Sequence, residues 1–141
     1  YDIFDIFIGS EYYFDGLAAE LGKDTSKPLT DEEKFAVMRY VQDKGAQIVI
    51  FTFGADGCMG VYGDHTFSLP AMDIPVVDTT GAGDAFNGGL LAGLSQGMDL
   101  LSAARYGNVV SNLAVTKMGT APAMPSKKEI QEFIKNHKVE L

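Results

Sequence analysis

Several features that mark common protein classes are scarce or missing in this sequence. The single cysteine, Cys58, cannot form an internal disulfide, which favours a reducing compartment, the cytoplasm. No apolar run approaches the roughly 18 residues that a membrane helix needs, so no membrane partner is expected. Basic residues adjoin only at Lys127 and Lys128, and the net charge is −8, which argues against a nucleic-acid partner. His65 and His137 are isolated and lack the spacing of metal ligands.

Two common nucleotide-binding templates are also absent. The pattern Gly81-x-Gly83-x-x-Phe86 lacks the third glycine of a dinucleotide fingerprint, and the Gly-x-x-x-x-Gly-Lys-Ser/Thr pattern of P-loop proteins occurs nowhere. The composition, with 46% hydrophobic and 21% charged residues over 141 positions, is that of one ordinary globular core. The sequence therefore indicates a folded domain, and it supports neither a Rossmann cofactor site nor a P-loop.

The most informative segment that is present runs from Asp78 to Phe86 and reads Asp-Thr-Thr-Gly-Ala-Gly-Asp-Ala-Phe. A strand-like run ends at Val77, a turn rich in glycine follows, and the carboxylate of Asp84 stands where the next helix must begin. The N–H groups of such a turn and the positive end of a helix suit an anion. A carboxylate beside them suits a base that accepts a proton, as in phosphoryl transfer to a hydroxyl. Because Asp is also a favoured helix N-cap and Gly a favoured turn residue, a purely structural role stays open.

The segment from Asp78 to Gly88 resembles the C-terminal signature of the ribokinase-like (PfkB) carbohydrate kinases. The resemblance implies an enzyme that uses ATP and Mg²⁺ to phosphorylate a hydroxyl of a sugar. It implies that Asp84 is the base and that the N–H groups of Gly81, Ala82 and Gly83 form the anion hole for the γ-phosphate. Nucleoside or vitamin kinases of the same superfamily are an alternative. A nucleotide- or sugar-binding homologue without turnover is another.

The resemblance also implies what this chain contributes to such a kinase. Residues 1–141 correspond to the C-terminal, ATP-binding half of one PfkB-type kinase domain, without the N-terminal sugar-binding half and its lid. Residues 1–8 open directly in a strand-like alternation, which is typical of an interior strand. The chain alone is therefore expected to be inactive as a kinase. The family also admits a homodimer formed through the lid.

The patterning of the chain predicts an α/β fold with flanking helices and a β-hairpin. The resemblance implies that this is the C-terminal part of a ribokinase-like fold with a mostly parallel sheet. Capping boxes and glycines mark the helix ends, and apolar runs and the Gly63-Asp64 turn mark the strands. The expected helices cover residues 10–21, 30–44, 82–96 and 100–117 and a segment that starts at Ser126. The expected strands cover residues 1–8, 47–53, 58–62 and 65–69.

Small residues mark two neighbouring helices. A glycine inside a helix costs about 1 kcal/mol relative to alanine, so several of them call for a compensating contact. We therefore predict that the two helices pack closely, with little side chain between them, and that this contact holds the start of the Asp84 helix. The small residues are Gly88, Gly89 and Gly93 in the first helix and Ala103, Gly107 and Ser111 in the second.

A second nucleotide contact is expected directly after the buried strand. The segment from Thr52 to Gly57 lies at the carboxyl end of that strand, where open α/β sheets bind ligands, although a plain turn explains it equally well. The resemblance implies that Thr52, Gly54 and Gly57 contact the phosphates and ribose of ATP. It implies further that Asn108 contacts adenine, with an ordinary exposed helical asparagine as the alternative.

The resemblance implies a K⁺ site beside the anion hole, built mostly from backbone carbonyls. The matching positions are Asp78, Thr80, Ala114, Lys117, Gly119 and Ala123. At Ala123 the family often has a hydroxyl or thiol side chain, so a ligand is missing here and a dependence on K⁺ is in question.

The start of the chain departs from the family. Ser10 and Tyr13 stand where the family carries an Asn-x-x-Glu that positions the Mg²⁺ waters and the phosphates. Glu11 is the carboxylate that remains nearby, and Mg²⁺ is usually held through carboxylates, waters and phosphates. Either Glu11 substitutes or metal handling is altered. Tyr13 itself is expected in the core.

Overall fold

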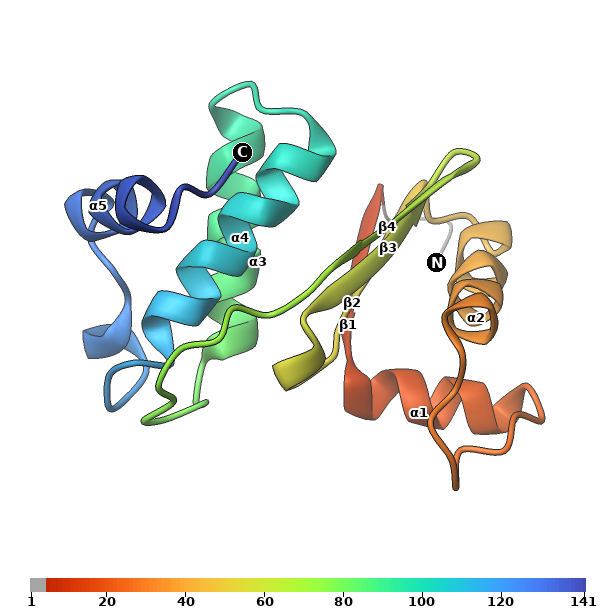
Figure 1. Cartoon of the computed structure of the whole chain (residues 1–141). Coiled ribbons are helices and arrows are strands. Elements are labelled where there is room, and N and C mark those ends of the chain that lie inside the picture. Colours follow the sequence, from red (N-terminus) through yellow and green to blue (C-terminus); the bar gives the residue numbers. More distant parts are fainter. Residues whose placement is uncertain (1–4) are drawn as a thin grey trace. The chain divides into compact units, whose positions relative to one another are not determined.

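The computed structural model describes residues 5–141 (Figure 1). The chain forms two compact units, the first ending at Pro70 and the second covering Ala71–Leu141. The strand expected over residues 1–8 lies partly outside the described residues. Within the described part of the chain, no helix is long and apolar enough to cross a lipid bilayer.

The first unit contains a four-stranded sheet with the strand order β1-β2-β3-β4. The strands are β1 (Ile6–Ser10), β2 (Ile48–Thr52), β3 (Cys58–Tyr62) and β4 (His65–Leu69). The predicted buried strand and hairpin are confirmed. The sheet is mixed rather than mostly parallel, because only β1 and β2 run parallel. A parallel pair needs a long crossover, and the short turns after β2 and β3 force antiparallel pairing.

Two helices connect β1 to β2 in the first unit. They are α1 (Glu11–Glu20) and α2 (Asp31–Asp43), close to the bounds that the sequence predicts. The predicted capping box starts α2: Thr30 Oγ1 accepts a hydrogen bond from Glu33 N at 3.3 Å, and Glu33 Oε2 accepts one from Thr30 N at 3.0 Å. Both reciprocal bonds satisfy N–H groups that a helix start leaves without partners.

The core of the first unit is built around the ring of Phe51 on β2, which is fully buried. Phe14 packs edge-on against this ring with centroids 5.2 Å apart, and Gly9 pairs with Phe51 across the sheet. A Cβ atom on Gly9 would lie only 2.7 Å from Phe51 Cδ1, so the ring occupies the space of the missing side chain. Tyr13 is 45% exposed and stacks on Phe51 from outside, which corrects its expected place in the core. Phe14, the next residue on α1, is the buried one.

The second unit consists of helices. They are α3 (Ala82–Ser95), α4 (Leu100–Ala114) and α5 (Lys127–His137), with a short 3₁₀ turn, η2 (Ala121–Ala123), before α5. The predicted capping box of Ser126 and Glu129 is present. Helix α4 ends at Ala114, three residues before the predicted end at Lys117.

Residues 71–77 belong to no strand, which corrects the prediction of a strand ending at Val77. We call this segment the strap. Its hydrogen bonds go to α4 and its C-cap: Met72 N donates to Asn112 Oδ1 at 3.1 Å, and Val77 N donates to Val115 O at 2.8 Å. Pro75 lies within the strap and has no N–H to donate to a neighbouring strand. The strap leads directly into the Asp78–Asp84 block.

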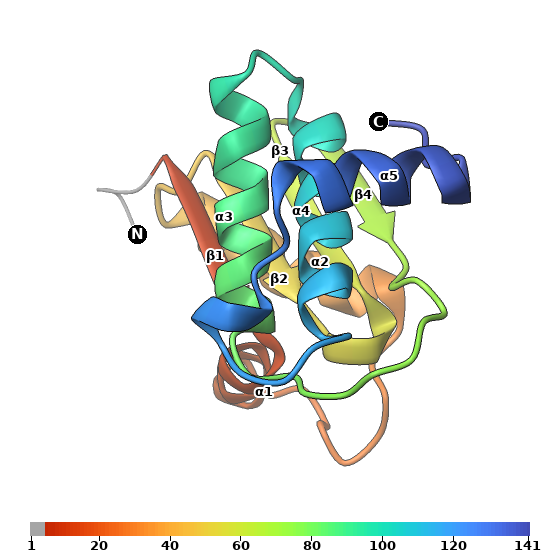
Figure 2. The ribbon, with the colours of Figure 1, turned by 90° about the vertical axis from the view of Figure 1, so that its left-hand side faces the viewer.

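Helices α3 and α4 lie side by side along most of their length (Figures 1 and 2). A Cβ atom on Gly89 would lie 2.7 Å from Gly107 Cα, and one on Gly107 would lie 2.8 Å from Phe86 O. At Gly93 the corresponding distance is 3.0 Å, to Ala103 Cα. The predicted close packing is confirmed. Gly88 is not part of it, since a Cβ atom there would meet nothing within 4 Å.

Adding one methyl group at the contact and one away from it tests this packing. We expect Gly89→Ala to lower the free energy of unfolding by roughly 1–3 kcal/mol, because the added Cβ meets backbone that cannot move aside. Gly88→Ala is the matched control, and it should be neutral or stabilise by up to about 1 kcal/mol, the helix-propensity gain. Urea unfolding of both variants measures the difference. Equal effects would show that the helices do not depend on this contact.

Candidate active site

Asp78 is the anchor of the loop that precedes α3. Its Oδ1 accepts hydrogen bonds from Thr80 N at 2.9 Å and Thr80 Oγ1 at 2.6 Å, and its Oδ2 accepts one from Gly119 N at 2.9 Å. The bonds from Thr80 and Gly119 lower the pKa of the Asp78 carboxyl. Since both oxygens accept such bonds, Asp78 is held as a carboxylate with its acceptors committed to the loop.

The structure brings together part of the predicted cation set. Asp78, Thr80 and Gly119 are linked directly by these bonds. Lys117 N donates to Ala114 O at 3.2 Å, and the side chain of Lys117 turns to α5, where Nζ lies 2.5 Å from Glu129 Oε1. Among residues 5–141, no group of three or more His, Cys, Asp or Glu side chains could hold a metal ion, so a cation here would depend on carbonyl oxygens.

The turn from Thr79 to Gly81 starts α3 without help from a side chain. Gly81 is the N-cap with a φ of 79°, in the left-handed region that favours glycine, and no side chain caps the helix. Ala82 N donates to Thr79 O at 3.1 Å, so this N–H has an acceptor within the turn, and its place in an anion hole stays a prediction. Over the described part of the chain, the N–H groups of Gly81, Gly83 and Asp84 have no acceptor.

The N–H of Asp84 is the group that sequence reasoning missed. The signal was available, because the first turn of any helix leaves its N–H groups without intrahelical acceptors. Open donors at the positive end of a helix are the arrangement that suits an anion. We call residues 79–84 the anion-binding turn after this predicted role. A Cβ atom on Gly83 would meet nothing within 4 Å, so the space beside this residue is open.

The Asp84 carboxylate is exposed and lies in the first turn of α3, three residues after the N-cap Gly81. Among the described residues it accepts no hydrogen bond and forms no ion pair. The N-cap alternative for Asp84 is therefore wrong. No contact among the described residues therefore gives the Asp84 carboxylate a structural role.

The loop around Gly119 packs against the anion-binding turn. The position of a Cβ atom on Gly81 lies 3.5 Å from Thr120 Cγ2 and 3.6 Å from Met124 Cε. The loop that holds Asp78 through Gly119 thus also supports the N-cap of α3. Asp78, Asp84 and the open N–H groups at the start of α3 thus all lie in the second unit. The Gly119 loop contacts both Asp78 and Gly81.

The segment after β2 in the first unit is a closed turn. Residues Gly54–Asp56 form a 3₁₀ turn, η1, and Phe53 N donates to Gly57 O at 2.8 Å across it. Gly54 and Gly57 have φ values of 52° and 92°, so both positions favour glycine. The turn reading is confirmed, and the predicted nucleotide role of Thr52, Gly54 and Gly57 stays a prediction.

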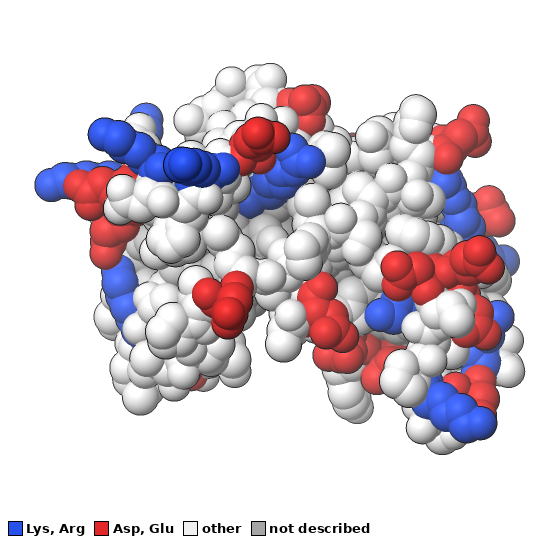
Figure 3. Space-filling view, viewed as in Figure 1, with Lys and Arg blue, Asp and Glu red and all other residues white. Residues whose placement is uncertain are grey.

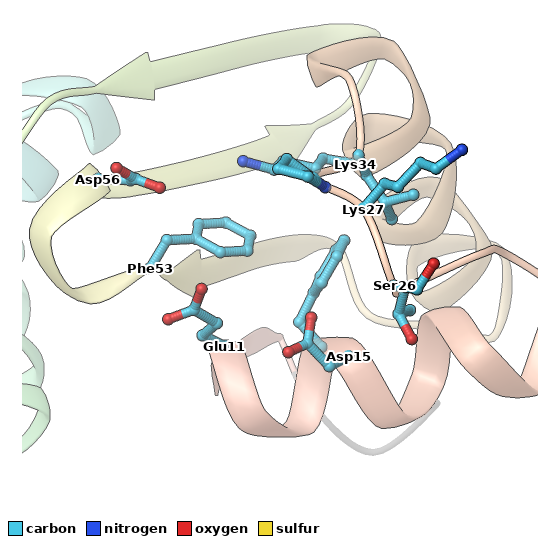
Figure 4. A pocket seen from close by; sticks show the side chains of 11 residues that line it. Glu11, Asp15, Ser26, Lys27, Lys34, Phe53 and Asp56 are labelled. Carbon is cyan, nitrogen blue, oxygen red and sulfur yellow. The ribbon is translucent and has the colours of Figure 1, made fainter.

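Glu11 faces a pocket of about 350 Å³ in the first unit (Figure 4). Asp15 from α1, Lys27 from the loop before α2, Lys34 from α2 and Asp56 from η1 line the same pocket. The Lys34 ammonium lies 4.7 Å from the centroid of the Phe53 ring. Among the described residues none of these five charged side chains forms an ion pair. Sequence reasoning found Glu11 but not its companions, which come from four separate segments.

Asn108 lies on α4 and is half-buried rather than an ordinary exposed helical residue. Its side-chain Oδ1 accepts a hydrogen bond from Asn112 Nδ2 at 3.1 Å. The Asn112 side chain is 7% exposed and also accepts from Met72 N in the strap. The expected nucleotide residue is thus connected to the segment that leads into the anion-binding turn.

Comparison with known proteins shows which family the sequence resembles. The model of the pfkB family carbohydrate kinases matches residues 5–127. Aminoimidazole riboside kinase from Salmonella typhimurium is 38% identical over 103 residues, covering 70% of this chain and 32% of its own length.

Two solved structures show the same fold. Ribokinase from Thermotoga maritima superposes with a TM-score of 0.83 at 27% identity, covering 94% of this chain and 42% of its own. Arabidopsis thaliana ribokinase, complexed with ribose and ATP, gives a TM-score of 0.82 at 25% identity, covering 95% of this chain and 42% of its own. The chain thus spans about two fifths of the solved kinases and a third of the curated relative.

The ion pair that ties α5 to the Gly119 loop gives a prediction for stability against pH. The hydrogen bond from Lys117, with those from Ser126, lowers the pKa of Glu129 from 4.5 to about 2. Because folding favours the ionised form, its contribution is complete above pH 4.5 and is lost as the pH falls toward 2. We expect Glu129→Gln to be less stable than the wild type at pH 7, with the difference shrinking below pH 4.5 in urea unfolding.

Glu132→Gln is the matched control for this effect. It removes an exposed pair on the same helix, in which Lys128 Nζ and Glu132 Oε1 are 3.8 Å apart. Basic and acidic side chains are interleaved over α5 in this way (Figure 3). Exposed pairs of this kind contribute little, so the control should change stability only slightly at any pH. A pH-independent loss in Glu129→Gln would contradict the assigned role of its charge.

Proposed function

The chain belongs to the pfkB family of carbohydrate kinases, and we propose that the protein transfers the γ-phosphate of ATP to a hydroxyl of a sugar. The observation that carries this proposal is the start of α3. Open N–H groups and the positive end of a helix lie beside an uncommitted carboxylate, Asp84. The first suits an oxyanion that gains charge, and the second suits removal of a proton.

We assign separate roles in phosphoryl transfer to the Asp84 carboxylate and to the N–H groups at the start of α3. The proton of the sugar hydroxyl goes to the Asp84 carboxylate as the hydroxyl oxygen bonds to phosphorus, and ADP leaves with the bridging oxygen. The N–H groups of Gly81, Gly83 and Asp84 stabilise the oxygens of the phosphoryl group during transfer. Asp78 is unsuited to the role of base, because both of its oxygens already accept hydrogen bonds.

The remaining sites are proposed on the same footing. Thr52, Gly54, Gly57 and Asn108 would hold ATP. A monovalent cation, K⁺, would be held by Asp78 and Thr80 with carbonyl groups of Ala114, Lys117, Gly119 and Ala123. Potassium would act by supporting the loop that carries the anion-binding turn, since Asp78 already bonds to Gly119.

Mg²⁺ is implied by the chemistry, because phosphoryl transfer from ATP depends on a cation that offsets the charge of the phosphates. We propose that Glu11 takes the place of the family Asn-x-x-Glu. Glu11 Oε2 lies 3.9 Å from the position of a Cβ atom on Gly54, so its carboxylate lies at the turn assigned to ATP. Oxygen ligands of this kind fit Mg²⁺, which is held through one or two carboxylates together with phosphates and waters.

One observation favours a second candidate, a binding homologue without turnover. Ser10 is the N-cap of α1 without a side-chain hydrogen bond, and Tyr13 stacks on Phe51. Neither supplies the amide and carboxylate that the family has at these positions. A nucleotide- or sugar-binding protein would need no base, however, and Asp84 is retained.

The test of the proposed function is Asp84→Asn in the full-length protein. We expect a loss of roughly 10²–10⁴-fold in kcat with sugars as acceptors, the usual range for a general base, while ATP still binds. ADP release in steady state and nucleotide binding by calorimetry measure the two effects. Asp73→Asn, an exposed carboxylate in the strap, is the control and should keep wild-type turnover. Unchanged turnover in Asp84→Asn would refute the role of base, and no ADP release from the wild type with any sugar would favour the binding homologue.

Glu11→Gln tests the metal proposal separately. The variant keeps the shape of the side chain but loses its charge, so we expect the Mg²⁺ concentration for half-maximal activity to rise about tenfold, equal to about 1.4 kcal/mol of metal binding. Asp15→Asn is the matched control, because Asp15 lines the same pocket one turn further along α1. Equal Mg²⁺ requirements in Glu11→Gln and the wild type would show that the metal is held elsewhere.

A further inference from the structure

Asn112 is a buried carboxamide in the last turn of α4, and its two ends bond in different directions. Its Oδ1 accepts a hydrogen bond from Met72 N in the strap at 3.1 Å. Its Nδ2 donates to Asn108 O at 2.6 Å and to Asn108 Oδ1 at 3.1 Å. With 7% of its surface exposed, the side chain lies between the strap and Asn108.

Burying the carboxamide of Asn112 costs more free energy than burying an apolar side chain of similar size. Removing an amide from water costs free energy that its hydrogen bonds only offset, so an apolar side chain would serve packing at least as well. The neighbours of Asn112 on α4 follow that rule, since Val109, Val110 and Ala114 are apolar and buried. The use of the carboxamide must therefore lie in its directional bonds.

The directions of these bonds leave no ambiguity in the orientation of the amide. Met72 N can only donate, so the end of Asn112 that faces the strap must be the oxygen. The NH₂ group then faces Asn108 and selects the oxygen of that side chain as its partner. Through Asn112, the backbone N–H of Met72 thus favours the orientation in which the oxygen of Asn108 faces Asn112.

The strap itself gains a fixed start from the same residue. Asn112 holds it at Met72, and the carbonyl of Val115 holds it at Val77 and Asp78, with N–O distances of 2.8 and 3.2 Å. Between these points the strap belongs to no helix or strand. Both anchors lie on α4 or its C-cap, so α4 sets the path by which the chain enters the anion-binding turn.

We infer that Asn112 is a positioning residue for the nucleotide site, which orients the Asn108 carboxamide and anchors the strap at Met72. The inference rests on the proposed function, in which Asn108 contacts the base of ATP. Asn112 touches neither the nucleotide nor the sugar in this role. Its effect should appear in nucleotide binding and much less in the transfer step, because Asp84 and the N–H groups of α3 are held by other contacts.

Asn112→Asp separates orientation from packing in the full-length protein. Aspartate keeps the acceptor for Met72 N but places an oxygen against Asn108 Oδ1, so Asn108 loses this donor and the two oxygens repel each other. We expect KM for ATP to rise about tenfold, the size of one lost directional contact, with kcat within about threefold of the wild type. The ratio of kcat/KM for ATP to that for GTP should change as well, which a general loss of stability would not produce.

Two further variants keep the test decisive if Asn112→Asp folds poorly. Asn112→Ala removes both bonds without adding charge and should raise KM for ATP in the same way. Ile130→Val is the control for stability, because it removes one methylene from the core between α4 and α5 without touching Asn108 or the strap, and KM should stay unchanged. Circular dichroism confirms folding before each measurement.

A double-mutant cycle with Asn108→Ala decides whether the effect passes through Asn108. If it does, Asn112→Ala in the Asn108→Ala background should leave KM for ATP unchanged. Independent, multiplying effects would overturn the inference, as would an unchanged KM in Asn112→Ala or in Asn108→Ala. If the wild type binds ATP and the variants give any of these results, only the inference about Asn112 fails. If the wild type neither binds ATP nor releases ADP, the proposed function itself fails.

Discussion

The close approach of the α3 and α4 backbones is the contact on which the second unit depends. Gly89 and Gly107 bring the helices so near that neither position has room for a Cβ atom. Contacts at this distance are lost with any lateral shift, because interiors are packed without spare volume. The helix that begins beside Asp84 and the helix that anchors the strap are therefore held as one body. Glycine costs helix propensity at these positions, and the packing offsets that cost.

The two aspartates of the signature show how local contacts separate chemical roles. Asp78 and Asp84 lie six residues apart, yet Asp78 accepts three hydrogen bonds and Asp84 accepts none within the described residues. Bonds to a carboxylate stabilise its charged form and lower its pKa, which makes Asp78 a poor proton acceptor and a good structural anchor. The same turn that commits Asp78 leaves Asp84 exposed at the surface of α3.

Features with a short-range physical cause could be predicted from the sequence. The capping boxes at Thr30 and Ser126 and the hairpin turn depend on residues within three positions of one another, and all are confirmed. The strand before Val77 could not be predicted correctly, because apolar alternation does not say whether a partner strand exists. Tyr13 shows a related limit: helical spacing fits it to the core as well as Phe14, and only the direction of α1 over Phe51 decides between them.

The parts of the candidate site that are close together in sequence could also be predicted, and the parts that depend on long-range contacts could not. The anion-binding turn and Asp84 are contiguous in sequence, whereas the bond from Gly119 N to Asp78 spans 41 residues and the pocket around Glu11 draws on four segments. Three carboxylates, Glu11, Asp15 and Asp56, and two ammonium groups, Lys27 and Lys34, line that pocket, so charges of both signs meet there. Charges brought together from separate segments leave no local pattern in the sequence, because only the folded chain makes them neighbours. A contiguous turn can therefore be found from sequence, whereas a pocket of this kind requires the structure.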